Sequence, residues 1–422
     1  MLAPAFPSTR DSGLKRGSLP GHSGGTVPDF HRLPPIAIVW AEAYDSGDRV
    51  ETVTNVRAGR SGPDACPGAL RTHDAADGPL ARVRTPGGAV TSAQLAVLGA
   101  AARELGLDVI ELTSRGNMQV RGVRATERLA VLLANAGLLP SASHERVRNI
   151  VASPLGGRGP RGTLATDPLV AALDRRLCAN PRLAGLPGRF LFAFDDGTGD
   201  IAALDADVAY GPAGFRLGGT PVDLAGGEDP VGTMLAAAGA FLDVRGDAWR
   251  LAEVPNGASV VAARLGRTVA GEGPVRAEGA SPFAGVIEQR DGLVSLEVVP
   301  PLGRLSGAQA EVLAEVAGEV RVTPWRSVVL RDLAPGEVRA TAERLAAAGF
   351  ATDAASPWVG VTACTGSPGC ARSRGDVQGE ARGWVGGLDG APETPVHWVG
   401  CERCCGTPRG PVVLKMVGGA ER

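Results

Sequence analysis

The sequence has no long apolar run, no secretory signal and no excess of charge of either sign. No apolar stretch reaches the length of a membrane span, and the first residues lack the charged, apolar and small-residue order of a signal peptide. A net charge of −2 over 422 residues provides no general field to hold nucleic acid or an anionic membrane. We therefore expect a cytoplasmic protein of two or three packed domains, with no nucleic-acid or membrane partner.

Two common cofactor motifs are also missing. No glycine-rich dinucleotide fingerprint follows a strand, so electrons must come from an external donor. The five histidines show neither metal-ligand spacing nor the arrangement of two histidines and one carboxylate that holds mononuclear iron. We interpret all of them as structural and single out His144, beside Glu145, as the one to test. They are His22, His31, His73, His144 and His397.

One pattern of elements occurs twice, in residues 78–137 and again in 292–350. Each copy reads as a strand, a helix opened by a capping box, further strands, and a second helix closed by glycine. The capping boxes pair Thr91 with Gln94 and Ser306 with Gln309, and the closing glycines are Gly137 and Gly349. Such a repeat predicts pseudo-two-fold symmetry with a binding surface around the shared axis.

These patterns divide the chain into five segments. Residues 1–63, rich in Pro, Gly, Ser and Arg, are predicted to be a disordered extension. The repeats define two half-domains of the same pattern, 64–145 and 285–353. A central α/β domain, 146–284, separates them, with a helix capped by Asp167 and begun at Pro168. The remaining residues, 354–422, form a domain rich in cysteine.

Two cysteine pairs in this last domain have unequal spacing. Five residues separate Cys364 from Cys370, and three separate Cys401 from Cys405. Four thiolates from two loops can surround a four-iron, four-sulfur cluster, which is wider than a single metal ion. Zinc, disulfides and buried thiols are the alternatives; zinc pairs usually enclose two to four residues, and a reducing compartment disfavours disulfides.

The sequence alone does not decide the fourth cluster ligand. Cys404 competes with Cys405 as the fourth ligand, whereas Cys66 and Cys178 have no partner at a useful spacing and are interpreted as core or loop thiols. Helix-forming residues from Ala371 onward would point the positive end of a helix toward an anionic cluster.

Polar side chains alternate along one segment of the first repeat. They are Thr113, Arg115, Asn117, Gln119 and Arg121. The equivalent positions of the second repeat have diverged, and they are Thr323, Trp325, Ser327, Val329 and Arg331. Asymmetry inside a symmetric frame indicates a site, and arginine forks pair well with carboxylates. The alternative is an ordinary solvated strand face.

The two cysteine pairs, together with the duplicated half-domain, resemble the nitrite and sulfite reductase haemoprotein family over roughly residues 64–415. The resemblance implies an α+β fold. It consists of duplicated ferredoxin-like half-domains plus two α/β nitrite/sulfite reductase-type cluster/haem domains with pseudo-two-fold symmetry. The segments CPGALR, LTSRGNMQVRG, VRNIVASPLGG and LPGRFLFAFDDG resemble the branch of the family that acts on precorrins.

The resemblance also assigns roles to residues. Cluster ligands would be Cys364, Cys370, Cys401 and Cys405, the last of which bridges to siroheme iron in the reductases. Residues that bind the tetrapyrrole would be Arg115, Arg121, Arg148, Asn149 and Arg189, and Arg115, Asn117 and Gln119 would also be catalytic. Leu191 stands where the reductases have a second basic residue, which leaves their oxyanion cradle incomplete and favours the precorrin branch.

The activity implied by this branch is that of a monooxygenase. It would hydroxylate precorrin-3A with dioxygen and form a lactone, in aerobic cobalamin biosynthesis. Its partners would be the cluster and an external donor, either a reductase or a ferredoxin. A mononuclear non-haem iron is compatible with this chemistry, although the sequence indicates no ligands for it. The alternatives are a siroheme-dependent nitrite or sulfite reductase and a zinc-stapled, non-enzymatic binding module.

Overall fold

The structure is a computed structural model that describes residues 50–51, 66–223, 227–270 and 283–418. Most of the predicted extension, 1–63, therefore lies outside the described residues. Its described part, Val50–Glu51, is a strand, β1, which pairs antiparallel with β19 (Val412–Met416). In the described ranges, no helix is long and apolar enough to cross a membrane.

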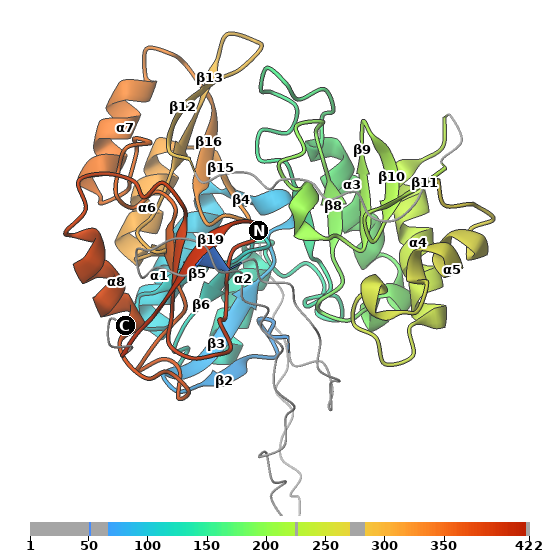
Figure 1. Ribbon diagram of the computed structural model, residues 1–422, viewed down its shortest axis with the longest axis horizontal. Helices are drawn as coiled ribbons and strands as arrows, with labels where there is room; N and C mark the ends of the chain where they lie inside the picture. The colour runs from blue at the N-terminus through green and yellow to red at the C-terminus, as the bar shows by residue number, and fades with distance from the viewer. Residues whose placement is uncertain (1–49, 52–65, 224–226, 271–282, 419–422) are drawn as a thin grey trace, which may run out of the picture. The chain divides into compact units, whose positions relative to one another are not determined.

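Two five-stranded antiparallel sheets carry the two repeats (Figure 1). The first has the order β14-β5-β6-β3-β2, formed by Arg304–Leu305, Ile110–Leu112, Met118–Val120, Gly78–Val83 and His73–Ala75. The second has the order β12-β13-β16-β15-β4, formed by Gly285–Glu288, Val294–Val298, Val328–Leu333, Glu319–Val322 and Ala89–Thr91. Strand β14 of the second repeat thus completes the first sheet, and β4 of the first repeat completes the second.

The predicted helix caps are confirmed in both repeats. Thr91 Oγ1 accepts from Gln94 N at the start of α1 (Ser92–Leu105), and Ser306 Oγ accepts from Gln309 N at the start of α6 (Gly307–Val316). Both glutamine side chains then donate to the end of the next helix, α2 (Thr126–Asn135) or α7 (Val338–Ala347), through Ala136 O and Ala348 O at 3.0 and 3.1 Å.

Helices α1 and α6 approach each other through glycines. A Cβ atom on Gly307 would lie 2.6 Å from Gly99 O, and one on Gly99 would lie 2.9 Å from Gly307 O. Larger residues would separate the helices, so the small side chains fix how closely the two repeats pack. Leu98, Leu313 and Leu330, all fully buried, belong to the one core that the repeats share.

The central domain has a five-stranded mixed sheet of order β11-β10-β9-β8-β7. Its strands are Thr220–Val222, Gly214–Leu217, Val208–Gly211, Phe192–Phe194 and Ile150–Ala152. Its helices are α3 (Asp167–Cys178), α4 (Pro230–Val244) and α5 (Gly257–Arg264), with short 3-10 turns η2 (Pro181–Gly185), η3 (Ala202–Leu204) and η4 (Leu251–Glu253). A further 3-10 turn, η1 (Pro86–Gly88), precedes β4.

The predicted cap of α3 is wrong by one residue. The N-cap is Thr166, and Asp167 is the first helical residue. The Asp167 carboxylate instead accepts from Arg331 Nη2 at 3.0 Å and from Arg158 Nη1 at 3.1 Å. Ion pairing with arginines of other segments takes the oxygens that capping would have used.

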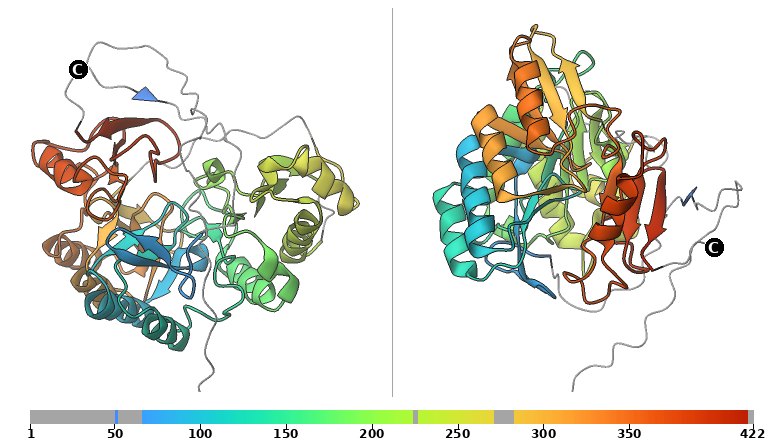
Figure 2. Two further views of the ribbon diagram at one scale, coloured as in Figure 1. Left: turned by 90° about the horizontal axis from the view of Figure 1, so that it is seen from below. Right: turned by 90° about the vertical axis from the view of Figure 1, so that its left-hand side faces the viewer.

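The last domain is a sheet of order β1-β19-β18-β17 that packs against one helix. Strands β17 (Val361–Ala363), β18 (Val396–Val399) and β19 run parallel, and α8 (Val377–Val385) contacts the first two (Figure 2). The helix expected from Ala371 begins at Val377, because Asp376 caps it by accepting from Gly379 N, and Gly375 is a poor helix former.

Candidate functional site

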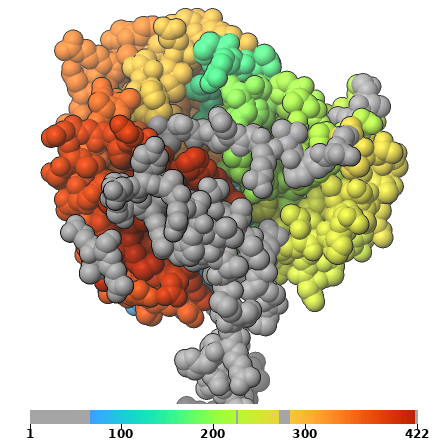
Figure 3. Space-filling model, in the orientation of Figure 1, coloured from blue at the N-terminus to red at the C-terminus, as the bar shows by residue number. Residues whose placement is uncertain are grey.

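The four predicted cluster cysteines lie on two loops that follow the parallel strands β17 and β18. Carboxyl ends of parallel neighbours meet at the same edge of a sheet, so these loops come together. Cys364 N donates to Trp398 O at 2.9 Å, and Gly400 N points at Cys364 Sγ, 3.3 Å away. The last domain forms part of the surface on the face shown in Figure 3.

The cysteines of the two loops affect one another electrostatically. Burial raises the pKa of the Cys364 thiol, the Gly400 hydrogen bond opposes this shift, and the charges of Cys401 and Cys370 add to it. Burial likewise raises the pKa of Cys405, and Cys401, Cys364 and Cys370 raise it further. Iron would relieve this mutual repulsion, because metal binding favours thiolates. The donor set and the peptide N–H directed at sulfur thus fit an iron–sulfur cluster.

The described ranges contain no group of three or more His, Cys, Asp or Glu side chains placed to hold a metal ion. The cluster is therefore a prediction that rests on the convergence of the two loops. The two loops pack closely at Gly400, where a Cβ atom would lie 2.0 Å from Ser373 Oγ. A larger residue there would push the two loops apart.

Cys404 and Cys405 differ in their surroundings. Cys404 has a left-handed backbone, with φ of 45°, and its N–H donates to Cys401 O at 3.1 Å. The carbonyl of Cys405 lies 3.1 Å from His397 Nε2, and His397 Nδ1 lies 2.8 Å from Thr362 Oγ1. A carbonyl can only accept, so Nε2 carries the proton and Nδ1 accepts from the threonine.

The two described buried histidines are held by protein contacts. Burial, and after it the charge of Arg326, lower the pKa of His397 to about 3, so the ring is neutral. His144 is 2% exposed and contacts Ser141 Oγ through Nδ1 and Asn180 O through Nε2. Both rings therefore serve the structure, as the sequence predicts.

Arg121 fastens the first cysteine loop to the first half-domain. Its guanidinium forms two bonds to Asp77, of 2.9 and 2.7 Å, and reaches Glu111 at 3.3 Å. It also donates to Thr365 Oγ1 at 3.3 Å and to Gly369 O at 3.1 Å, both between Cys364 and Cys370. The predicted tetrapyrrole ligand thus lies in a contact that positions the loop.

Arg84 is a buried cation whose hydrogen-bonding capacity is only partly used. It is 2% exposed, and its Nη2 donates to Pro67 O and Arg146 O, at 3.2 Å each. Its Nε and Nη1 are buried without a hydrogen-bond partner among the described residues. Burial lowers its pKa well below the usual range, and Arg82 and Arg115 add to this shift. Buried donors of this kind normally have a partner, which points to a bound anion.

Arg115 completes this group, which we call the arginine cluster (Arg82, Arg84 and Arg115). Burial, and after it the charge of Arg250, lower the pKa of Arg115 to about 9. No hydrogen bond or ion pair of the Arg115 side chain forms within the part of the chain that the structure describes. Arg115 is therefore a buried cation without an ion-pair partner among the described residues. Arg82 and Arg84 were missed in the sequence, although they occupy alternate positions of one strand, LARVR.

A hydrogen-bonded path joins the arginine cluster to the cysteine loop. Arg82 Nε donates to Gln119 Oε1 at 2.8 Å, and Gln119 Nε2 donates to Glu111 at 3.0 Å. Glu111 accepts in turn from Thr365 Oγ1 at 3.2 Å. Burial would raise the pKa of Glu111, but Arg304 and Arg121 outweigh it and hold the group ionised. Gln119 therefore links the two parts of the site.

The two predicted asparagines meet each other. Asn117 Nδ2 donates to Asn149 Oδ1 at 3.4 Å, and Asn149 Nδ2 donates to Gly188 O at 2.9 Å. Thr85 N also donates to Asn117 Oδ1 at 3.0 Å. The pair connects the first half-domain to the central domain, next to Arg189.

The other two predicted arginines have different surroundings. Arg148 is buried and forms a bidentate pair with Asp174, with both bonds 2.7 Å long. Arg189 is exposed and lies over the Trp249 ring, with Cζ 5.5 Å from its centroid. Arg148 therefore supports the scaffold, whereas Arg189 is accessible.

A charged residue that the sequence did not reveal, Arg250, lies near Leu191. Leu191 is buried, and its N–H donates to Asp207 Oδ2 at 2.8 Å. Arg250 Nε donates to the same oxygen at 2.6 Å. The charge of Arg250 reaches Arg115, as its effect on the pKa of that residue shows. Arg250 could not be found from the sequence, because it lies at no fixed spacing from the predicted motifs.

The second repeat has the opposite electrostatics. By the matching strand registers, Glu297 corresponds to Arg82, and Trp325 corresponds to Arg115. Trp325 Nε1 donates to Glu297 at 2.6 Å. Burial, with a smaller contribution from Asp200, raises the pKa of Glu297 to about 7. Only the first repeat therefore presents cations at these positions.

The buried Glu297 predicts a pH dependence of stability. Its pKa is raised from 4.5 to about 7, so its contribution to stability is complete below 4.5 and is lost as the pH rises through 7. Glu297→Gln should remove this decline, which amounts to about 3 kcal/mol at most. Urea unfolding between pH 5 and 8 measures it. Equal slopes for variant and wild type would contradict the assignment.

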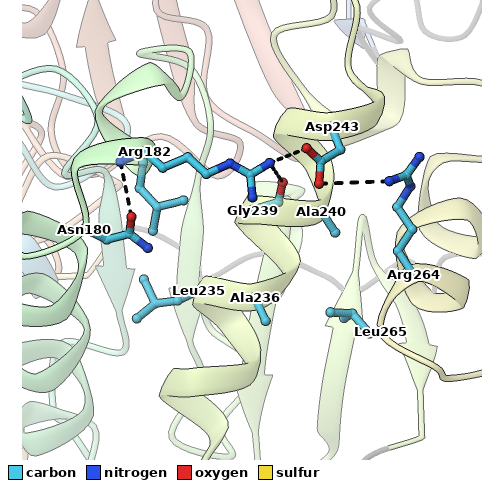
Figure 4. Close-up of a pocket in the computed structure, with 10 residues that line it drawn as sticks. Asn180, Arg182, Leu235, Ala236, Gly239, Ala240, Asp243, Arg264 and Leu265 are labelled. Atoms are coloured by element: carbon cyan, nitrogen blue, oxygen red, sulfur yellow. Dashed lines mark hydrogen bonds and ion pairs between the residues drawn. The ribbon is translucent and has the colours of Figure 1, made fainter.

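A surface pocket of about 450 Å³ lies in the central domain, between η2, α4 and α5 (Figure 4). Asp243 pairs there with Arg182 and, at 4.0 Å, with Arg264. The residues that line this pocket include none of the predicted site residues, and its charges are already paired.

Residues 73–134 and 287–348 match the family model described as the nitrite/sulfite reductase ferredoxin-like half domain. These stretches coincide with the two repeats, from β2 to α2 and from β12 to α7. The chain therefore contains this half domain twice, and the predicted α+β fold and the resemblance to the nitrite and sulfite reductase family are confirmed.

Similar proteins include two enzymes of different kinds. The chain is 28% identical to a precorrin-3B synthase of Sinorhizobium sp., over 87% of this chain and 82% of that protein. It is 27% identical to a ferredoxin–nitrite reductase of Synechococcus elongatus, over 78% and 74%. The solved structure of the Mycobacterium tuberculosis NirA protein matches with a TM-score of 0.62 at 21% identity, over 78% of this chain and 69% of that one. The last likeness concerns the fold alone.

Proposed function

We propose that this chain is a precorrin-3B synthase, an oxidoreductase that hydroxylates precorrin-3A with dioxygen and forms a lactone from a ring carboxylate. The observation that carries this proposal is the arginine cluster, in which Arg84 has two buried donors, and Arg115 has a buried side chain, without a partner among the described residues. Precorrins bear many carboxylates, and guanidinium groups bind carboxylates with two parallel hydrogen bonds. We place the reaction in the cytoplasm.

Cys364, Cys370, Cys401 and Cys405 would hold the four-iron, four-sulfur cluster, which supplies single electrons when bound. An external reductase or ferredoxin would reduce it. Arg84 and Arg115 hold acetate and propionate side chains of the precorrin. Arg189 binds further carboxylates at the exposed edge of the site. Arg121 holds the first cysteine loop in place through Thr365 and Gly369.

Gln119 and Asn117 have fixed orientations that suit a positioning role. Gln119 is held by Arg82 and Glu111, and Asn117 is held by Thr85 and Asn149. Because these bonds exist before any ligand binds, neither side chain has to be ordered on binding. Leu191 favours the precorrin branch, since an apolar buried residue supplies no cation at this position, and the nearby Arg250 is paired with Asp207.

The test combines cofactor and reaction. Protein purified without oxygen is analysed for iron and acid-labile sulfide and is then incubated with precorrin-3A, a reductant and labelled dioxygen. We expect about four irons per chain and one labelled oxygen in the product. Unchanged substrate beside an intact cluster would contradict the proposal. Bound siroheme with nitrite or sulfite reduction would establish the reductase, and about one zinc without sulfide would establish the binding module.

Arg115→Gln should weaken tetrapyrrole binding about 10- to 100-fold. A hydrogen bond to a charged group contributes roughly 1.5–3 kcal/mol, and each 1.4 kcal/mol is a factor of ten in affinity. Fluorescence titration with uroporphyrin, a stable polycarboxylate tetrapyrrole, measures the effect. The matched control is Arg128→Gln, because Arg128 is exposed and pairs with Glu104 at the surface. Equal affinities for both variants would contradict the assignment.

A further inference from the structure

The segment CPGALR is held firmly against the first half-domain. Glu145 accepts from the backbone N–H groups of Ala69, Leu70 and Arg71, at 2.7, 2.6 and 3.1 Å. Three bonds to one carboxylate fix the turn, and Glu145 itself is only 6% exposed. The position of Cys66 at the start of this turn is therefore well defined.

Two further contacts bring Cys66 to the arginine cluster. Arg82 N donates to Gly68 O at 2.9 Å, and Arg84 Nη2 donates to Pro67 O, the carbonyl next to Cys66, at 3.2 Å. The same guanidinium has its Nε and Nη1 buried without a partner among the described residues. An incompletely bonded cation thus lies beside a half-buried cysteine.

Electrostatics agree with this geometry. The charge of Cys66 opposes the lowering of the pKa of both Arg84 and Arg115. The sulfur is therefore near both guanidinium groups. Two guanidinium charges beside a partly exposed thiol attract anionic reagents to it.

We propose that Cys66 is a covalent modification site within the arginine cluster, and that it reacts preferentially with anionic electrophiles. Arg84 and Arg115 attract the anion and hold it beside the sulfur. With iodoacetate, a C–S bond forms as the C–I bond breaks, iodide leaves, and the thiol proton passes to solvent. The product adds a carboxylate to the arginine cluster and would exclude a carboxylate arm of the tetrapyrrole.

The experiment compares iodoacetate with neutral iodoacetamide on the whole protein, purified without oxygen. Peptide mass spectrometry gives the rate of modification at each cysteine. Cys178 is the internal reference, since burial and the neighbouring Asp174 raise its pKa and outweigh the opposing effect of Arg148. We expect the ratio of iodoacetate to iodoacetamide rates to be about tenfold higher at Cys66 than at Cys178, and to fall with added salt.

Arg115→Gln should lower the ratio at Cys66, whereas Arg128→Gln, at an exposed surface pair, should leave it unchanged. Equal ratios at Cys66 and Cys178, or no effect of Arg115→Gln, would overturn the proposal. A second measurement, which rests on the proposed function, repeats the modification with uroporphyrin present. Bound uroporphyrin should shield Cys66 from iodoacetate. If the anionic preference holds without shielding, the thiol site stands, and the placement of the tetrapyrrole at the arginine cluster is wrong.

Discussion

Cys405→Ser should reduce iron and acid-labile sulfide in the anaerobically purified protein from about four of each per chain to almost none. Three cysteine ligands leave one corner of the cluster without a thiolate, and serine is a poor replacement for it. Cys405 is one of four sulfurs whose charges affect one another across the two loops. Metal and sulfide analysis, with the visible spectrum, measures the loss.

The matched control is Cys404→Ser, which changes the neighbouring cysteine and should retain the cluster. The reverse result, with loss at position 404 and retention at 405, would move the fourth ligand to Cys404. Retention in both variants, and in Cys370→Ser, would remove the cluster from this site altogether.

Arg121→Met should destabilise the apo-protein by roughly 3–5 kcal/mol, because it leaves the buried Asp77 carboxylate without its bidentate partner and leaves Glu111 with Arg304 alone. The side chains of Asp77 and Glu111 are only 12% and 13% exposed, so water cannot replace the guanidinium fully. Urea unfolding of the apo-protein measures the change. The variant also loses the bonds to Thr365 and Gly369, so cluster incorporation should fall with it.

The control for this variant is Arg103→Met. Its partner is Glu311, and both side chains are substantially exposed, at 37% and 44%. Exposed pairs contribute little, so the change should stay within about 1 kcal/mol. Similar losses in both variants would show that Arg121 has no special part in holding the cysteine loop.

Features encoded within a few residues were predictable from the sequence. The capping boxes at Thr91 and Ser306 depend on residues three positions apart, and they define the repeat on which the fold prediction depends. The convergence of the cysteine loops was also predictable as a hypothesis, because unequal spacing indicates a wide cofactor. The parallel pairing of β17 and β18 brings those loops together.

Features that depend on distant partners were not predictable. Arg121 and Arg148 read as ligands for carboxylates, and they do bind carboxylates, but those of Asp77 and Asp174. These partners are 44 and 26 residues away in the chain, and no local sequence pattern predicts them. Arg84 was overlooked for the converse reason, since only its burial shows that two of its donors lack a partner among the described residues.

The exchange of edge strands between the two repeats has a consequence for how the chain can fold. Strand β5 gains its outer neighbour from Arg304–Leu305, and β15 gains its neighbour from Ala89–Thr91. During synthesis, the early half would leave the ribosome with an open sheet edge until nearly two hundred further residues had been made. If the chain is divided into two fragments within the central domain, each fragment should therefore be insoluble alone. The two should fold to a soluble complex when they are mixed.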